Sequence, residues 1–254
     1  MRTIKKVASH IFIDGFGGMT QGLFATLIIG TMIQQIGLLI GGSTGNVIYL
    51  LGKAAAALTS AGIGVGVAVK YGESPLVTVS AAVAAMVGGY AGKITGGTFF
   101  VDGNAVLAGP GEPLGAFIAA FAGITCGHLV SGKTKVDIIV TPVITIGAGS
   151  VVGLLVGPPI SQMMTGLGSI INWATEQRPF IMGIVVSVVM GMVLTLPISS
   201  AALGIILNLS GLAAGAATIG CCCNMVGFAV ASYRENKFGG LVAQGLGTSM
   251  LQVP

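Results

Sequence analysis

Charged residues are scarce in this sequence: its 254 residues include 11 Lys and Arg and 7 Asp and Glu, or 7%. Residues 15–52, 74–92, 138–175 and 179–233 contain none of these four types. A soluble domain usually has about 25% charged residues, so this chain lacks the polar surface that water requires. Since one helical crossing takes about 20 mostly apolar residues, the uncharged stretches hold several membrane spans.

Alternation of polar and apolar residues is also missing, and this excludes a membrane β-barrel. Barrel strands alternate over roughly ten residues, whereas residues 184–194 and 79–89 are apolar at nearly every position. Glycine is abundant instead, with 43 residues, and small residues let membrane helices pack closely. We therefore predict an all-α polytopic membrane protein with about seven or eight transmembrane helices and re-entrant Gly-rich loops.

Cysteines and clusters of positive charge are few. Three of the four cysteines are consecutive, at 221–223, where side chains of one helix point about 100° apart and do not converge on a metal. The net charge of +4 comes from cations scattered between apolar runs, without the basic stripe of a nucleic-acid-binding surface. We expect no cofactor, no metal and no nucleic-acid partner.

The order of charges and apolar runs predicts a topology. Arg2, Lys5 and Lys6 precede the first long apolar run, so the positive-inside rule puts the N-terminus in the cytoplasm. We expect Gly157, Pro158 and Pro159 to end one span and residues 161–179 to form an interfacial helix. The predicted spans lie at about 17–40, 47–69, 75–93, 114–130 and 138–157, with a sixth from 179 and a seventh ending near 220.

One polar segment, residues 94–113, interrupts the apolar pattern, and no spanning helix fits it. Irregular backbone at membrane depth is tolerated only inside protein or beside water, so we interpret the segment as a re-entrant loop. It contains Asp102 and Asn104, which either contribute to a polar binding site or form an Asx turn.

Glu112 is the most informative carboxylate because GPGEP places it in apolar surroundings, where an unpaired charge is expensive. Two interpretations follow. The side chain accepts a hydrogen bond from a solute or takes up a proton, or it caps the helix that begins near Leu114.

Other polar residues carry weaker signals. His128 could relay a proton or a phosphoryl group, although a histidine at headgroup level is common. Asn224 and Gln244 are amides in apolar surroundings, suited to solute contact or to hydrogen bonds between helices. No His pair, Ser/His arrangement or paired carboxylate occurs at a spacing that would support an intramembrane enzyme.

Several long strings resemble, in the expected order, the EIIC-like membrane proteins of the bacterial sugar phosphotransferase system, in the group that includes the perfringolysin O regulator. They are GPGEPLGAF (109–117), GKTKVDIIVTP (132–142), MGMVLTLPISSAA (190–202), GLAAGAATIGCCCNMVGFAVASYREN (211–236) and GLGTSMLQVP (245–254). The resemblance implies one membrane-embedded domain over residues 1–254, truncated at its C-terminal end, that forms a homodimer in the bacterial cell membrane.

The resemblance also implies a site. Sugar-transporting relatives use a Gly-Ile-Thr-Glu-Pro loop whose Glu binds sugar hydroxyls. Glu112 and Pro113 match the end of that motif, whereas Pro110 and Gly111 depart from it. The resemblance thus implies a solute site between re-entrant loops and helices, and the candidate solute-binding residues are Asp102, Asn104, Glu112, Pro113, His128, Asn224 and Gln244.

The resulting hypothesis is a permease that moves a small polar solute, such as a sugar, across the bilayer. The chain resembles none of the soluble domains with a phosphorylatable Cys or His. Soluble phosphotransferase partners would therefore supply any phosphoryl group, and the chain would be at most the membrane subunit of a sugar phosphotransferase. The alternative is a membrane-bound sensor or regulator that binds a solute or a protein partner without net transport.

Overall fold

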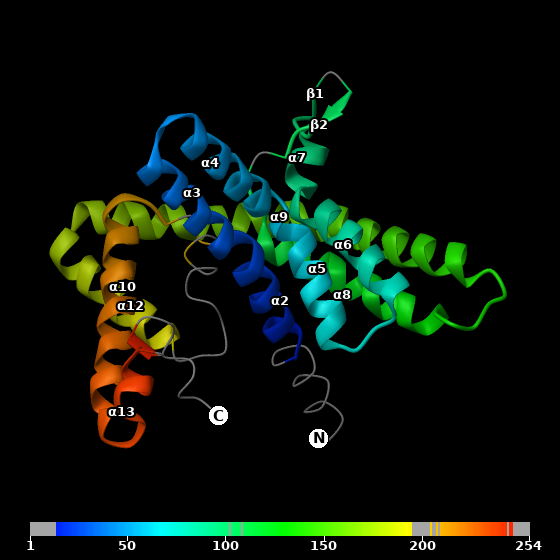
Figure 1. Ribbon diagram of the computed structural model, residues 1–254. Coiled ribbons are helices and arrows are strands. Elements are labelled where there is room, and N and C mark those ends of the chain that lie inside the picture. Colours follow the sequence, from blue (N-terminus) through cyan, green and yellow to red (C-terminus); the bar gives the residue numbers. More distant parts are fainter. Residues whose placement is uncertain are drawn as a thin grey trace, which may run out of the picture. The chain divides into compact units, whose positions relative to one another are not determined.

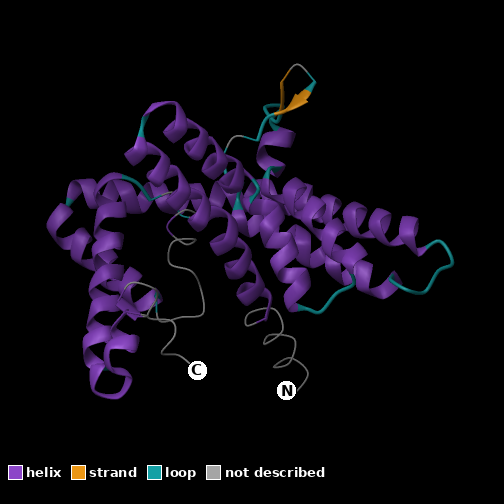
Figure 2. Ribbon diagram, in the orientation of Figure 1, coloured by secondary structure: helices purple, strands orange, loops and turns teal. Residues whose placement is uncertain are grey.

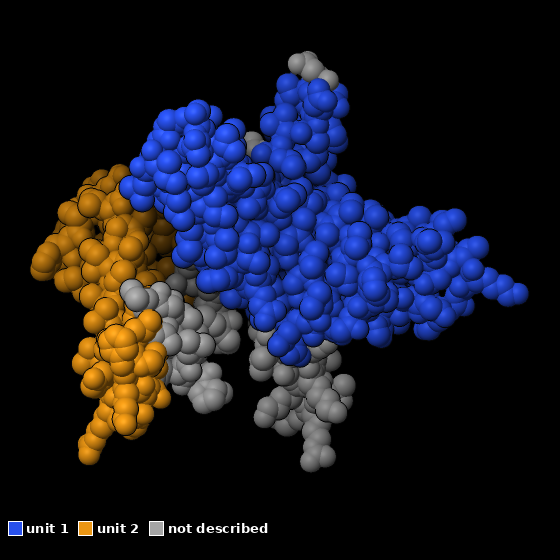
Figure 3. All heavy atoms as spheres, viewed as in Figure 1, with its two compact units in different colours: residues 1–162 blue, residues 163–254 orange. Residues whose placement is uncertain are grey.

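The computed structural model describes residues 14–101, 103–107, 109–194, 204, 207, 209–242 and 244–245. The chain divides into two compact units, Met1–Gln162 (unit 1) and Met163–Pro254 (unit 2), coloured blue and orange in Figure 3. Helices make up nearly all of the described secondary structure (Figure 2), as the sequence predicts.

Unit 1 consists of helices and one small hairpin (Figure 1). In chain order its elements are α2 (Phe16–Leu23), the π-helix η2 (Phe24–Ile28), α3 (Ile29–Ile40), α4 (Gly42–Ala57), α5 (Thr59–Lys70), α6 (Pro75–Gly89), α7 (Ala91–Thr95), β1 (Phe100–Val101), β2 (Asn104–Ala105), α8 (Pro113–Val130) and the first part of α9 (Asp137–Gln177).

Four helices of the described residues are long and apolar enough to cross a membrane: Phe16–Ile40, α8, α9 and α12 (Gly211–Ala231). The bent pair α4–α5 makes a fifth, and α6 and α10 (Pro179–Val193) are shorter apolar helices. Large apolar side chains such as Leu39, which is 87% exposed, face outward, as expected of surfaces that meet lipid. The chain is therefore a multi-pass helical membrane protein, and the spans predicted near 17–40 and 114–130 are confirmed.

The first helical hairpin of unit 1 is closed by glycines that meet across it. α2, η2 and α3 run antiparallel to α4 and α5. A Cβ on seven of the eight glycines would lie within 2.8 Å of a backbone atom of the partner glycine, and a Cβ on Gly62 would lie 2.6 Å from the Thr26 side chain. Only glycine lets the two backbones approach this closely. The reciprocal pairs are Gly18 with Gly66, Gly22 with Gly62, Gly30 with Gly52, and Gly37 with Gly45.

Both helices of this hairpin are irregular at the same level. The returning helix breaks at Leu58, where α4 and α5 meet at an angle of 53°. The π-helix η2 lies in the outgoing helix and packs against both α4 and α5. The sequence predicts an unbroken span at 47–69, and the structure corrects it: the returning helix starts at Gly42 and bends in the middle.

Small residues also join α6, α8 and the start of α9. A Cβ on Gly88 would meet the Gly115 carbonyl at 2.5 Å, and a Cβ on Gly153 would lie 2.9 Å from the Gly88 Cα. In the same layer a Cβ on Gly149 would lie 2.7 Å from the Ala119 carbonyl oxygen. The small-residue stretch of α6 is thus packed inside the chain, as its composition predicts.

The predicted end of the fifth span at 157–159 is wrong. α9 continues for 41 residues with Pro142, Pro158 and Pro159 inside it, and no separate interfacial helix begins at 161. Prolines within membrane helices are tolerated because neighbouring groups satisfy the freed carbonyls. At 1.5 Å per residue α9 is about 60 Å long, or twice the hydrocarbon core, and the boundary between the units falls within it.

A two-stranded antiparallel hairpin of β1 and β2 projects from unit 1 beyond α7 (Figure 1). Its residues are exposed, including Phe100 and Val101. The sequence assigns this part of 94–113 to an irregular re-entrant loop, and neither α7 nor the hairpin was expected.

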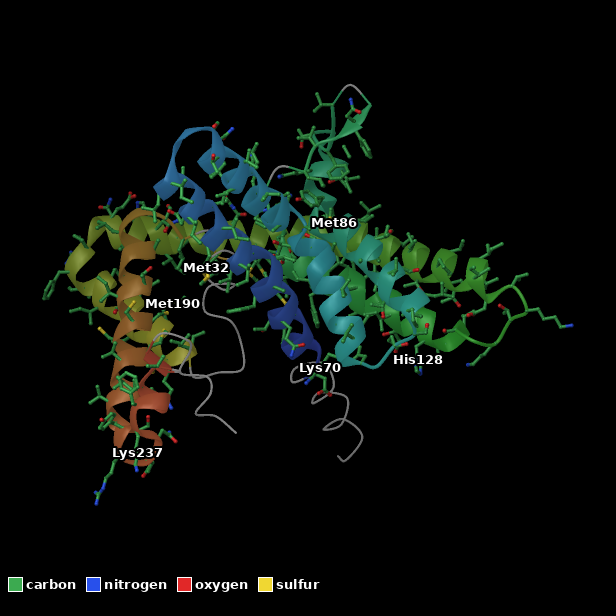
Figure 4. The ribbon with its side chains drawn as sticks, in the orientation of Figure 1. Met32, Lys70, Met86, His128, Met190 and Lys237 are labelled. Atoms are coloured by element: carbon green, nitrogen blue, oxygen red, sulfur yellow. The ribbon has the colours of Figure 1, made fainter. Side chains whose placement is uncertain are left out.

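Unit 2 contains the end of α9, α10, α12 and α13 (Tyr233–Val242). Val186 and Met190 of α10 pack with Ala217 of α12 in its core. A tight turn within α13 places Lys237 at positive φ, and its side chain points away from the helices (Figure 4). Residues 195–203, which carry the Pro-Ile-Ser-Ser break, lie outside the described residues.

Candidate functional site

The Glu112 carboxylate caps α8. Glu112 is the N-cap residue, with extended backbone angles, and Pro113 occupies the first helical position, where a missing N–H costs nothing. Glu112 Oε1 accepts a hydrogen bond from the Leu114 N–H at 3.1 Å, and Oε2 accepts one from the Gly115 N–H. Negative charge at a helix N-terminus is favourable. The capping interpretation of Glu112 therefore describes its geometry.

The loop before α8, residues 109–112 (the GPGE loop), is fastened to two other helices. The Glu112 N–H donates to the Gly89 carbonyl at the end of α6, at 2.7 Å. The Ser60 hydroxyl in α5 donates to the Pro110 carbonyl at 2.9 Å. These contacts hold an irregular segment against protein rather than lipid, as its backbone polar groups require.

Tyr90 contacts the loop from the junction of α6 and α7 and is 1% exposed. Its hydroxyl is within hydrogen-bonding reach of two carbonyl oxygens, that of Gly109 in the loop and that of Ala57, at 3.3 Å. Ala57 is the last residue of α4, beside the break at Leu58. The loop therefore docks where the returning helix of the first hairpin is broken.

Two positions in the loop require glycine. Gly109 and Gly111 have φ of +80° and +74°, a region that residues with a Cβ rarely adopt. A Cβ on Gly111 would also contact the Ser60 hydroxyl and lie 3.1 Å from the Gly89 carbonyl oxygen. The Gly-Pro-Gly sequence thus matches both the backbone conformation and the close docking.

Helix lengths give the depth of this docking point. α5 and α6 meet at the turn that follows Lys70, with 12 and 15 residues respectively, which correspond to about 18 and 22 Å. Ser60 and Gly89, which hold the loop, lie at the far ends of these helices. Because the hydrocarbon core is about 30 Å thick, a turn at the membrane surface would place the GPGE loop within the bilayer rather than beyond it.

Comparison with known proteins identifies the family of this helical membrane chain. A family model described as "Phosphotransferase system, EIIC" matches residues 13–254. This chain belongs to that family. No curated protein and no solved structure matches it significantly. As an EIIC chain, the protein is a permease-type transport component of a phosphotransferase system, embedded in the membrane by several helices.

Of the residues of this EIIC chain predicted to bind solute, Glu112 and Pro113 lie in or next to the docked loop. Asn104 lies in β2, in the exposed hairpin. Asp102 lies outside the described residues.

His128 is at the opposite end of α8, about 24 Å from Glu112 along the helix. It is 70% exposed, and its Nδ1 lies 2.9 Å from Glu73 Oε1. Because a small sugar is much shorter than this separation, Glu112 and His128 do not contact one solute molecule together.

Lys70 and His128 share that end of unit 1, away from the β1–β2 hairpin (Figure 4). The Ser74 and Ser131 hydroxyls, 3.0 Å apart, join α6 to α8 there. Burial, followed by the nearby Asp14 carboxylate, raises the pKa of Tyr71 to about 12. The GPGE loop and the side chains of Lys70, Glu73 and His128 thus lie at opposite ends of the bundle formed by α5, α6 and α8.

The two amides predicted as candidates belong to unit 2. Gln244 is buried, and its Oε1 accepts a hydrogen bond from the Ser232 hydroxyl at 2.9 Å, a contact that suits packing. Asn224 lines a small, open apolar groove of about 240 Å³.

Sequence reasoning missed Ser60 and Tyr90, the two side chains that fasten the loop. Ser60 lies within a predicted span, where a lone hydroxyl usually bonds to its own helix. Tyr90 lies near the end of one, where an aromatic ring is usually an interfacial anchor. The signal available in the sequence was the change from a run of alanines at 54–57 to a Thr-Ser pair at 59–60.

Proposed function

We propose that this EIIC chain carries a small polar solute, namely a sugar, across the bacterial cell membrane, and that the GPGE loop with Glu112 is its binding element. The observation that supports the proposal is a carboxylate in an irregular loop that docks between helices. Such loops occur at membrane depth only where protein or a polar cavity surrounds them.

Glu112 retains hydrogen-bonding capacity beyond its capping role. A carboxylate accepts about four hydrogen bonds, and the cap uses two, from the N–H groups of Leu114 and Gly115. The residue is only partly buried, so the remaining lone pairs are available to a ligand. Sugars present several hydroxyl donors, and hydrogen bonds to a charged acceptor are roughly twice as strong as neutral ones.

The proposal includes an orientation and partners. The N-terminus and the end of unit 1 with Lys70, Lys133 and Lys135 face the cytoplasm, in accordance with the positive-inside rule. Soluble phosphotransferase components act at that face, where the exposed His128 imidazole, paired with the largely buried Glu73 carboxylate, is accessible to them. The chain works as a homodimer.

Reconstitution into proteoliposomes tests the function directly. Uptake of a panel of radiolabelled hexoses, pentoses, hexitols and nucleosides is measured with and without soluble phosphotransferase proteins. We expect one sugar class to accumulate above protein-free liposomes. Saturable binding of a panel member without uptake would favour the sensor function instead, and neither binding nor uptake of any sugar would contradict the proposal.

A further inference from the structure

We propose that Tyr90 is a positioning residue for the solute-binding loop: its hydroxyl fastens the GPGE loop to the broken end of α4 and so fixes where Glu112 is presented. The inference rests on the proposed function of this loop. Tyr90 is not expected to touch the solute, because it is 1% exposed.

The hydroxyl of Tyr90 lies within hydrogen-bonding reach of two carbonyl oxygens, and no other described side chain at the loop bonds to both. One is the carbonyl of Ala57, the last residue of α4, and carbonyls at a helix end lack their partner four residues on. The other is the carbonyl of Gly109, the first residue of the GPGE loop. A phenol has one hydrogen to donate, and here both carbonyl oxygens lie within reach of it, so one donor holds the loop carbonyl beside the carbonyl at the end of α4.

The ring of Tyr90 is held independently of its hydroxyl. The Phe99 ring lies 5.3 Å away, centroid to centroid, and Lys93 Nζ is 5.3 Å from the centre of the Tyr90 ring. Aromatic and cation–π contacts of this kind are preserved in phenylalanine. Replacing Tyr90 with Phe therefore removes the connection to the loop and leaves the packing in place.

Two further contacts restrict the same loop from other directions. Ser60 donates to the Pro110 carbonyl, and Glu112 donates its N–H to the Gly89 carbonyl. Ser60 stands just after the break and Ala57 just before it. The loop is thus tied to both sides of the 53° bend, so a change in the bend would move the loop with it.

The primary test measures loop position without any solute. Leu107, which is 38% exposed just before the loop, is replaced by Cys in a chain whose cysteines 221–223 are Ala, and its reaction with N-ethylmaleimide is timed by mass spectrometry. In Tyr90→Phe we expect this cysteine to react about fivefold faster, the factor that corresponds to one neutral hydrogen bond. Ser60→Ala should change the rate in the same direction.

Two controls separate positioning from general loosening. Native Cys126, half-buried within α8, reports on the helix bundle in the same sample and should keep its rate. Tyr49→Phe removes a hydroxyl that makes no hydrogen bond within the described residues and should change neither rate. The proposal would be overturned if the cysteine at position 107 reacted at the same rate in Tyr90→Phe and in Tyr49→Phe. It would also be overturned if the labelling rate of Cys126 rose in parallel in Tyr90→Phe.

Uptake then tests the functional part. With the labelled panel described above, Tyr90→Phe should raise the half-saturation concentration about fivefold with little change in maximal rate, since a misplaced loop weakens binding. If Tyr90→Phe left the half-saturation concentration unchanged while Glu112→Gln impaired uptake, the positioning role of Tyr90 would be refuted and the role of Glu112 would stand. If wild-type protein takes up no sugar, the proposed function fails, while the labelling rates still decide whether Tyr90 fastens the loop.

Discussion

Gly22 and Gly62 face each other so closely that a Cβ on Gly22 would lie 2.5 Å from the Gly62 carbonyl carbon. Gly17, five residues earlier on the same helix, has only the Lys70 side chain near its added Cβ among the described residues, at 3.9 Å. Alanine substitutions at these two positions therefore separate the effect of helix propensity on stability from the effect of contact between the helices.

Gly22→Ala should therefore lower the free energy of unfolding by about 1–3 kcal/mol, because the helices must separate to admit the methyl group. Gly17→Ala should be neutral or stabilising by up to about 1 kcal/mol, since alanine is the better helix former. Chemical unfolding in mild detergent measures both. Equal effects of the two substitutions would contradict the close contact.

Thr145 gives a second stability prediction. It is fully buried in α9, and its hydroxyl has no hydrogen-bond partner among the described residues. Thr145→Val keeps the shape and removes the unsatisfied group, so it should raise stability by about 1 kcal/mol. Thr141, also fully buried, donates to Asp137 Oδ1 at 2.6 Å, and Thr141→Val should destabilise by about 1–3 kcal/mol. Melting temperatures of the two variants should move in opposite directions.

Replacing Glu112 by Gln tests the binding element. If Glu112 accepts solute hydroxyls, the neutral amide should weaken solute binding about tenfold or more, because charge-assisted hydrogen bonds contribute about 1.5–3 kcal/mol each. Loss of the charged cap alone should cost only about 0.3–1 kcal/mol of stability. Glu73→Gln, at the other end of the bundle, is the matched control. Wild-type affinity combined with a slightly lower melting temperature would leave Glu112 as a helix cap only.

Orientation in the membrane can be measured by cysteine labelling. In a chain without native cysteines, Thr3→Cys should be protected from an impermeant maleimide added outside intact cells, because the N-terminus is expected to be cytoplasmic. Asn104→Cys, in the exposed hairpin at the opposite end of unit 1 from Lys70, should be labelled. Labelling of Thr3→Cys alone would invert the topology.

Self-association is the remaining prediction, and we expect dimers by mass analysis in lipid discs. The sequence favours the small-residue stretch 79–92, which runs from α6 into the start of α7, as the interface. However, Ala84 and Gly88 pack against α8 and α9 of the same chain. Ala84→Leu should therefore lower the melting temperature rather than only dissociate dimers. Monomers across several detergents and lipid discs would refute the dimer.

Hydropathy predicted the parts of the fold that depend on length and apolar composition. The spans near 17–40 and 114–130 were correct because each is an uninterrupted apolar run bounded by glycine or proline. The end expected at Pro158 was wrong, because proline removes a single N–H and surrounding helix turns can absorb that loss. A prediction from residue type alone does not include the neighbouring groups that satisfy the carbonyl freed by the proline.

The candidate site was predictable only in part. Glu112 was identified from its chemistry alone, and its capping role was one of the two interpretations that the sequence allowed. Ser60 and Tyr90 could not be assigned to the loop, because their partners, Pro110 and Gly109, are distant in sequence and offer only backbone carbonyls. Carbonyls are present at every residue, so no composition pattern identifies them as partners.

The π-helix in the first hairpin keeps its glycines in helical phase. Gly18 and Gly22 are four residues apart, and Gly30 and Gly37 are seven residues apart; both spacings keep a pair on one face of a helix. Gly22 and Gly30, however, are eight residues apart. In a regular α-helix this spacing would rotate the second pair away from the first by about 80°. A π-turn accommodates one extra residue, and η2 lies within this interval. Deleting one residue from Phe24–Ile28 should thus leave a regular helix with an intact glycine face, whereas a deletion at 31–36 would turn Gly37 away from Gly45 by about 100°.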